Sequence, residues 1–410
     1  MDDTAANQQF GRYWRAAAVS GFGSYVTLFA LQMVVILTLH GSATEVGWLN
    51  AARWLPFLVL GLIVGAIVDG RRRLPLMIGT DLAQAILLLA IPLLWWLDQL
   101  TLASLLVVVV LYGSASVVNG AATMSFLPRV VDRAHLQRAH ARIDGADAVA
   151  STSGPAIGGV LVSAVGAPAA VLFDSLTYLY SAMTLRRIRI DEPPARTGIT
   201  VRRLVADIGD GVRWSYGGSG LRPLAIATHG WFVGNAIVGV VLAPYAYRTL
   251  GLSPFEFGVV GAIGGVGALI GAGVTTRVGR RLGTGRTIVL CHVITVGAVG
   301  ALAGAGAVRG SFGAVLLLSV GQWLYGLAMG MSNSHEMSYR QLVTPDELQA
   351  RTNTTLRSLN RAIAMVAAPI AGILADTWGF RPTLVAAAGV FALVAIGLYA
   401  TPFRTAIAPV

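Results

Sequence analysis

The chain contains no lysine and only one cysteine, and each shortage narrows the functions open to it. All thirty of its basic residues are arginine, against nineteen acidic residues among 410 positions. Without lysine there is no P-loop lysine to bind a phosphate and no amine to form a Schiff base with a carbonyl substrate. The single Cys291 lies in an apolar run, which leaves no disulfide framework and no cysteine metal site.

Charge is scarce as well. Charged residues make up 12% of the chain and hydrophobic residues 55%, with a mean hydropathy of +0.69. A soluble globular protein carries roughly 25% charged residues. The apolar residues form runs of about 20, long enough to cross a hydrocarbon core as a helix. Residues 1–10 are polar, and the first apolar run is too long for a cleaved signal peptide. The composition therefore predicts an all-α membrane protein without a separate soluble domain.

Two short patterns recur along the chain at nearly one spacing. Ser42-x-x-Glu45 returns 211 residues later as Ser253-x-x-Glu256, and in each copy a glycine stands two residues after the glutamate. Pro155-x-x-Gly158 returns 214 residues later as Pro369-x-x-Gly372. The spacing predicts one module of about 200 residues written twice, as in membrane proteins built from parallel halves.

Each half holds six apolar runs, which predict twelve transmembrane helices in two pseudo-symmetric six-helix bundles. The expected domains are an N-terminal bundle (1–187), a cytoplasmic linker (188–220) and a C-terminal bundle (221–410). The expected crossings are 14–39, 44–68, 75–97, 101–127, 141–165, 168–185, 223–247, 255–276, 287–307, 312–337, 353–375 and 382–402.

The arginines set the expected orientation. Twenty-five of the thirty fall in alternate loops that start at the N-terminus, whereas the opposite loops hold only Arg248, Arg309 and Arg381. By the positive-inside rule, both termini and the linker are cytoplasmic, and the linker lies along the inner headgroups. Membrane topology thus explains the formal charge of +11 without a nucleic-acid partner.

Beside the twelve runs in two halves, two local motifs resemble the major facilitator superfamily. Gly65-x-x-x-Asp69, followed by Arg71, Arg72 and Arg73, is similar to its cytoplasmic signature, although Gly70 stands where the family has arginine. Gly154-Pro155-x-x-Gly158-Gly159 matches the core of the signature of its antiporters.

A third pattern narrows the resemblance to the type-3 drug:proton antiporter branch, which includes macrolide and siderophore exporters. It comprises the stretch from Ser42 to Asp69, Asp81, and the run Leu172-Phe173-Asp174-Ser175-Leu176-Thr177. The resemblance implies the major facilitator fold, export by alternating access and no cofactor. Asp81 is expected near the inner surface, where it neutralises the arginines at 71–73, and Asp174 is expected to have a packing role.

The resemblance also implies roles in gating. Asp69 is expected to latch the inner side shut against the N-terminus of the eleventh helix, near Thr352; the alternative is a simple topogenic charge cluster. The small residues at 154–159 are expected to meet a glycine face of the 255–276 run across the two halves. This face comprises Gly258, Gly261, Gly264, Gly265, Gly267 and Gly271. Ordinary close packing without gating is the alternative.

Charged residues inside a membrane segment are costly and therefore indicate function. Asp147 lies about two turns into its helix, with Asp144 one turn closer to the cytoplasm, and Arg361 is the repeat equivalent of Asp147. We expect Asp147 to bind the coupling proton, with a permanent Asp147–Arg361 ion pair as the alternative. Arg53 is a second buried cation, and Glu336 either titrates or anchors the inner gate.

The fold implied by the resemblance also nominates residues that line a central cavity, from the first, fourth, seventh and tenth helices. Aromatic and amide groups with few fixed charges suit a bulky amphipathic molecule. The nominated residues are Tyr25, Phe29, Gln32, Tyr112, Asn119, His229, Trp231, Asn235, Gln322, Trp323, Tyr325 and Asn333.

The sequence thus predicts a secondary transporter of the cytoplasmic membrane, a monomer that exports an amphipathic drug, siderophore or lipid-like molecule in exchange for protons. An importer or uniporter of a small metabolite on the same fold is the nearest alternative. An integral membrane enzyme and a non-transporting receptor are weaker alternatives. The chain has no G-x-S-x-G, H-E-x-x-H or Walker motif, which argues against an enzyme. We expect no catalytic residue and no metal site.

Overall fold

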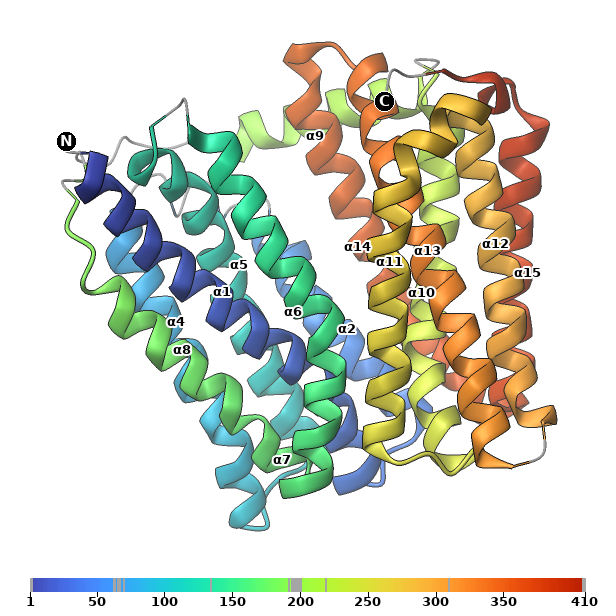
Figure 1. Ribbon diagram of the computed structural model, residues 1–410, viewed down its shortest axis with the longest axis horizontal. Coiled ribbons are helices and arrows are strands. Elements are labelled where there is room, and N and C mark those ends of the chain that lie inside the picture. The colour runs from blue at the N-terminus through green and yellow to red at the C-terminus, as the bar shows by residue number, and fades with distance from the viewer. Residues whose placement is uncertain are drawn as a thin grey trace. The chain divides into compact units, whose positions relative to one another are not determined.

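The computed structural model describes residues 3–61, 64, 68, 71–132, 135–190, 192, 201–217, 220–308 and 310–407. Within these ranges the chain forms helices and no strand (Figure 1). The α-helices are α1 (Asp3–Met33), α2 (Ala43–Leu60), α4 (Arg73–Trp96), α5 (Leu102–Val130), α6 (Leu136–Val165), α7 (Ala167–Ala170), α8 (Leu172–Leu185), α9 (Val201–Tyr216), α10 (Arg222–Arg248), α11 (Pro254–Leu282), α12 (Thr284–Gly304), α13 (Ser311–Val343), α14 (Asp346–Trp378) and α15 (Phe380–Ala400). Short π or 3₁₀ turns follow α1, α12 and α15 at Val34–Thr38, Ala305–Ala307 and Pro402–Thr405.

Ten helices in the described ranges are long and apolar enough to cross a membrane. They confirm the expected all-helical, multi-pass chain. Two of the twelve expected crossings fall on α2 and on the 14-residue α8, which are not among the ten. The number twelve therefore stays a prediction.

The chain divides into two compact units. Unit 1 comprises Met1–Gly41 and Ala52–Val201, and unit 2 comprises Ser42–Ala51 and Arg202–Val410. The division after Val201 falls inside the expected linker, whereas the first turns of α2 belong to unit 2.

In unit 1, α1 packs against α6 and α8, and α4 packs against α5 and α8. Figure 1 shows these helices side by side, with α1 running along α8 and α6. An aromatic contact between Tyr13 and Phe126, both almost fully buried, lies in the core at one end of this bundle. In unit 2, α13 packs against α11 and α12, and α10 packs against α14 and α15.

The repeated Ser-x-x-Glu pattern is a helix-start signal in both copies. The backbone N–H of Ser42 donates to the Glu45 carboxylate, and the N–H of Glu45 donates back to Ser42 Oγ over 3.2 Å. Ser253 and Glu256 make the same reciprocal pair at the start of α11, at 2.7 and 3.3 Å. Each pair satisfies two backbone donors that the first helical turn leaves free. The repeat therefore encodes the starts of α2 and α11.

The glycine face of α11 packs against α13 inside unit 2. A Cβ atom on Gly267 or Gly271 would overlap a carbonyl oxygen of α13, at Trp323 and Leu327 respectively. In return, a Cβ on Gly326 or Gly330 of α13 would overlap a carbonyl oxygen of α11. Gly264, Gly267 and Gly271 thus serve close packing of α11 on α13 inside unit 2, and the expected contact of the α11 glycine face with the small residues at 154–159 stays a prediction.

Helix α9, within the expected linker, packs on α14 as part of unit 2. Arg351 Nη1 lies 2.9 Å from Asp210 Oδ2. At Gly211 a Cβ would come within 2.8 Å of the Arg351 carbonyl oxygen and would overlap Thr355 Oγ1. The absence of a side chain at Gly211 thus permits the close approach of α9 to α14.

Gly211→Val should detach α9 from α14, because the added side chain has no room. Gly209→Val is the matched control, because a Cβ there meets nothing within 4 Å on the same helix. The change from glycine to valine alters the intrinsic helix propensity equally in both variants, by about 1 kcal/mol or less. Limited proteolysis should cut only the Gly211 variant faster within 201–217, and equal cutting of the two variants would contradict the packing role.

Candidate transport cavities

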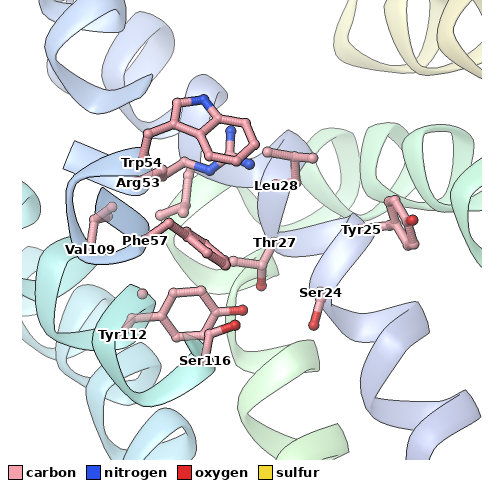
Figure 2. A pocket seen from close by; sticks show the side chains of 12 residues that line it. Ser24, Tyr25, Thr27, Leu28, Arg53, Trp54, Phe57, Val109, Tyr112 and Ser116 are labelled. Carbon is pink, nitrogen blue, oxygen red and sulfur yellow. The ribbon is translucent and has the colours of Figure 1, made fainter. Parts of the chain in front are cut away.

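Unit 1 contains a cavity of about 240 Å³ between α1, α2 and α5, which we term the aromatic cavity. Figure 2 shows Arg53, Trp54 and Phe57 of α2 near Leu28 and Thr27 of α1, with Tyr112 and Ser116 contributed by α5. Its lining residues are Ser24, Tyr25, Thr27, Leu28, Leu31, Arg53, Trp54, Phe57, Val109, Tyr112, Gly113 and Ser116. Rings and aliphatic groups thus surround one guanidinium and several hydroxyls.

A second cavity of about 220 Å³ lies in the same unit between α1, α4, α5 and α8, and we term it the acidic cavity. Its lining includes Asp81 and Gln84 of α4, Asn119 of α5, and Tyr178 and Ser181 of α8. Ser24 and Ser116 line both cavities.

A chain of hydroxyl groups runs between the two cavities. Tyr178 Oη lies 3.0 Å from Tyr112 Oη and 2.9 Å from Ser24 Oγ. Tyr112 lines the aromatic cavity, Tyr178 lines the acidic cavity and Ser24 lines both. Because a hydroxyl both donates and accepts, donor and acceptor can exchange roles along these hydrogen bonds without movement of a heavy atom.

Asp147 is exposed on α6, and its partner is Tyr25 of α1. Tyr25 Oη donates to the two carboxylate oxygens at 3.1 and 3.2 Å. The small residues of α6 permit this approach: a Cβ on Gly154 would come within 2.5 Å of Tyr25 Cβ, and one on Gly158 within 3.1 Å of the Phe29 ring. Asp144 is also exposed. Arg361 lies in unit 2, and its pairing with Asp147 stays a prediction.

The five nominated cavity residues of unit 1 lie as follows. Tyr25 and Tyr112 line the aromatic cavity, and Asn119 lines the acidic cavity. Phe29 is 7% exposed and packs against Gly158, while Gln32 is half-buried on α1. Pro155 lies inside α6 and Gly159 is buried.

In unit 2, His229 of α10 joins three helices. Its Nδ1 lies 2.6 Å from Asn360 Oδ1 of α14, and its Nε2 bonds Tyr216 of α9. Burial raises the pKa of Tyr216, so that its hydroxyl stays protonated and can donate to a neutral imidazole. His229 therefore has the geometry of a structural bridge from α9 into the bundle.

The remaining nominated residues of unit 2 are spread over α10 and α13. Tyr325 Oη donates to Asn235 Oδ1 at 2.7 Å, and the Trp231 ring meets Phe232 edge to face. Gln322 and Trp323 border the glycines of α11 through their backbone, Asn333 is exposed, and Glu336 accepts from Ser332 Oγ. No single described cavity brings this set together.

The expected inner latch is only partly within the described residues. Gly65 and Asp69 lie outside them. Arg71 and Arg72 are exposed, whereas Arg73 is buried at the start of α4 and donates to the Arg71 carbonyl over 3.3 Å. The latch of Asp69 thus stays a prediction.

Asp81 is buried inside unit 1 and is held by neutral side chains. Asp81 is 3% exposed, and it accepts hydrogen bonds from Asn119 and Ser181 at 2.6 Å each. No ion pair is seen for Asp81 among the residues described, and its expected neutralisation of the arginines at 71–73 stays a prediction. The only sequence feature that marks Asp81 is its position as an acid inside an apolar run. Its contact with Asn119 is visible only in the structure.

Comparison with known proteins now decides the family. The profile described as Major Facilitator Superfamily matches residues 14–364. The chain belongs to this superfamily. It is accordingly a membrane transporter and not an enzyme, and the superfamily resemblance found in the sequence is confirmed.

Two curated relatives are efflux pumps by name. The multidrug efflux pump Tap of Mycolicibacterium fortuitum is 28% identical over 384 residues, covering 90% of this chain and 90% of the pump. The multidrug efflux pump Tap of Mycobacterium tuberculosis is 26% identical over 223 residues, covering 52% of each chain.

Solved structures support the fold. A bacterial homologue of the iron transporter ferroportin, in its inward-facing state, matches with a TM-score of 0.79 at 15% identity, over 96% of this chain and 98% of the other. The nucleoside transporter NupG matches with a TM-score of 0.72 at 13% identity, over 98% and 99% of the two chains. At such identities the likeness shows the fold alone.

Proposed function

We propose that this superfamily member exports a bulky amphipathic small molecule across the cytoplasmic membrane by alternating access, driven by protons. The proposal includes a monomer with twelve crossings and both termini in the cytoplasm. The observation that carries it is the aromatic cavity of unit 1, whose lining brings Trp54, Phe57 and Tyr112 together with Arg53 (Figure 2). Apolar walls with a few convergent polar groups are typical of sites for small molecules.

The direction of transport rests on the relatives and on one motif. Tap, which matches over most of this chain, is named a multidrug efflux pump. Gly154-Pro155-x-x-Gly158-Gly159 agrees with the antiporter signature, and its glycines allow Tyr25 and Phe29 of α1 to approach α6. Import or uniport of a small metabolite is the competing function. Everted membrane vesicles distinguish the two, since an exporter driven by protons accumulates substrate inside them when their lumen is acidified.

Asp147 is the carboxylate that we assign to coupling in this proposal. It is bonded to Tyr25, which lies on the stretch of α1 that borders the aromatic cavity, so that the acid is attached to the helix that would contact the substrate. A substrate that shifts this stretch of α1 breaks the hydrogen bonds between Tyr25 and Asp147. Asp144 and Glu336 are the secondary candidates, and Arg361 is the proposed partner of Asp147 in one state of the cycle.

Asp147→Asn should abolish the response of transport to a pH gradient while leaving binding intact, because the amide keeps the shape but not the titration. We expect the gradient-driven rate in everted vesicles to fall at least about tenfold, equivalent to about 1.4 kcal/mol. Asp98→Asn is the control, since Asp98 is exposed in a turn at φ 53°, a conformation that asparagine also adopts. Unchanged gradient-driven efflux in the Asp147 variant would exclude its coupling role.

A further inference from the structure

The acidic cavity holds a carboxylate that is buried without a compensating charge. Both oxygens of Asp81 are occupied by neutral donors, the Asn119 amide at Oδ1 and the Ser181 hydroxyl at Oδ2, each at 2.6 Å. Asp81 itself is 3% exposed. An ionised carboxylate in such a place costs several kcal/mol unless a cation compensates its charge. A bound cation or a bound proton would therefore stabilise this buried carboxylate.

Among the described residues that line the acidic cavity, none is basic. Helix α8 contributes Tyr178 and Asp174, α1 contributes Tyr13, and α5 contributes the neutral Asn119. Helix α7 contains only alanine and proline. The basic residue at the start of α4 itself, Arg73, precedes Asp81 by two turns. Within the described parts of the chain, no ion pair involves Asp81, and no cluster of three or more His, Cys, Asp or Glu could hold a metal ion.

A second buried acid strengthens the case for a proton. Asp174 has no exposed surface and lies within electrostatic range of Asp81. Its Oδ1 accepts from Thr177 Oγ1 at 2.8 Å, and its Oδ2 has no hydrogen-bond partner among the described residues. A proton bound to either carboxylate removes the cost of burying its charge.

Water and hydroxyl groups give a proton a route to this place. The cavity of about 220 Å³ that Asp81 lines is many times the volume one water requires. Ser24 and Ser116 border the aromatic cavity as well, and the chain Tyr112–Tyr178–Ser24 connects the two. A molecule in the aromatic cavity thus lies against residues that also line the acidic cavity.

We propose that Asp81 is a proton-binding site inside unit 1, distinct from Asp147, and that the Tyr112–Tyr178–Ser24 hydroxyls link its occupancy to that of the aromatic cavity. Asp81 takes a proton from water in the acidic cavity and becomes a neutral carboxylic acid. Asn119 then keeps its bond to Oδ1, and the Ser181 hydroxyl rotates to accept from the acid. The link to the aromatic cavity rests on the proposed function, whereas proton binding by Asp81 does not.

The proton site is tested on the purified full-length chain in detergent with dicyclohexylcarbodiimide. This apolar reagent adds a protonated carboxylic acid across its C=N bond, the acid proton going to nitrogen, and the adduct rearranges to a stable N-acylurea. We expect mass spectrometry to find this adduct on Asp81, increasing several-fold as the pH is lowered, and to find none on the exposed Asp98. Asp81→Asn should remove the adduct from the α4 peptide. No adduct on Asp81 at any pH, or an adduct confined to Asp174, overturns the proposal.

Transport measurements separate this inference from the proposed function. Asp81→Asn should lower gradient-driven efflux about tenfold, and Asp81→Glu, which restores a titrating acid, should recover part of it; equal monodispersity of the variants excludes misfolding as the cause. Proton-driven efflux that survives in Asp81→Asn overturns the coupling of Asp81 and leaves the proposed function standing. A wild-type chain that labels at Asp81 but moves no amphipathic substrate overturns the proposed function and supports the proton site.

Discussion

Gly326→Val should leave little or no folded protein. Gly326 lies where α13 crosses α11, and a Cβ there would overlap the carbonyl oxygen of Gly264 and lie 3.0 Å from the Ala268 nitrogen. Both atoms belong to the backbone of a long helix, so that relief requires the helices to separate. Overpacking of this kind typically costs 1 to 3 kcal/mol or more, and the interface repeats the same contact at Gly267, Gly271 and Gly330.

The measurement is the melting temperature and the monodisperse fraction of the purified protein in detergent. Gly273→Val on α11 is the matched control, because a Cβ there meets nothing within 4 Å. It makes the same chemical change in a helix interior, so that intrinsic helix preference affects both variants equally. A Gly326 variant as stable as the Gly273 variant would mean that α11 and α13 do not touch as closely as described.

Asp376→Ala should free the first turn of α2. Asp376 of α14 accepts from the backbone N–H groups of Ala43 and Thr44 at 3.0 and 2.9 Å, and from Thr44 Oγ1 at 2.6 Å. A carboxylate at a helix N-terminus meets unsatisfied donors and the positive end of the helix dipole. Gly372, one turn earlier on α14, permits the approach, because a Cβ there would lie 2.5 Å from Thr44 Cα.

Hydrogen exchange of the amides at 43–46 measures this contact. Loss of a cap typically costs 0.5 to 2 kcal/mol, so that exchange through local opening should accelerate about tenfold. Asp376→Asn should show an intermediate effect, since it keeps an acceptor but loses the charge. Asp346→Asn on the same helix, where the carboxylate accepts only from Gln349 Nε2, serves as the control. Equal exchange in the alanine variant and the wild type would show that Asp376 does not hold α2.

The two repeat signals were readable from the sequence for one reason: they act locally. Ser42 and Glu45, like Ser253 and Glu256, are three residues apart, and a first helical turn brings them together whatever surrounds it. Apolar runs of membrane length were equally visible, because a helix in lipid must satisfy its own backbone and expose apolar side chains. These features identified an all-helical membrane chain and, with the motifs at 154–159, its superfamily.

The tertiary contacts of the small and polar residues could not be predicted from the sequence. A glycine face on α11 fits any smooth neighbour, and it is the backbone of α13, more than 50 residues away in the chain, that fills it. His229 was nominated for a cavity, yet Tyr216 and Asn360 occupy both of its ring nitrogens. Such assignments depend on which face of each helix turns inward, and the hydrophobic pattern of a membrane helix specifies this weakly because lipid and protein interior are both apolar.

By itself, then, the amino-acid sequence determined that this chain lies in a membrane as helices, that its halves repeat and that it belongs with transporters, since length, hydropathy and short-range capping are properties of consecutive residues. Only the tertiary structure placed Asp81 between Asn119 and Ser181, joined Asp376 to the start of α2 and formed the two cavities of unit 1. Each of these requires side chains from different helices at one depth. Their meeting is fixed by how whole helices pack, and no stretch of consecutive residues contains that information.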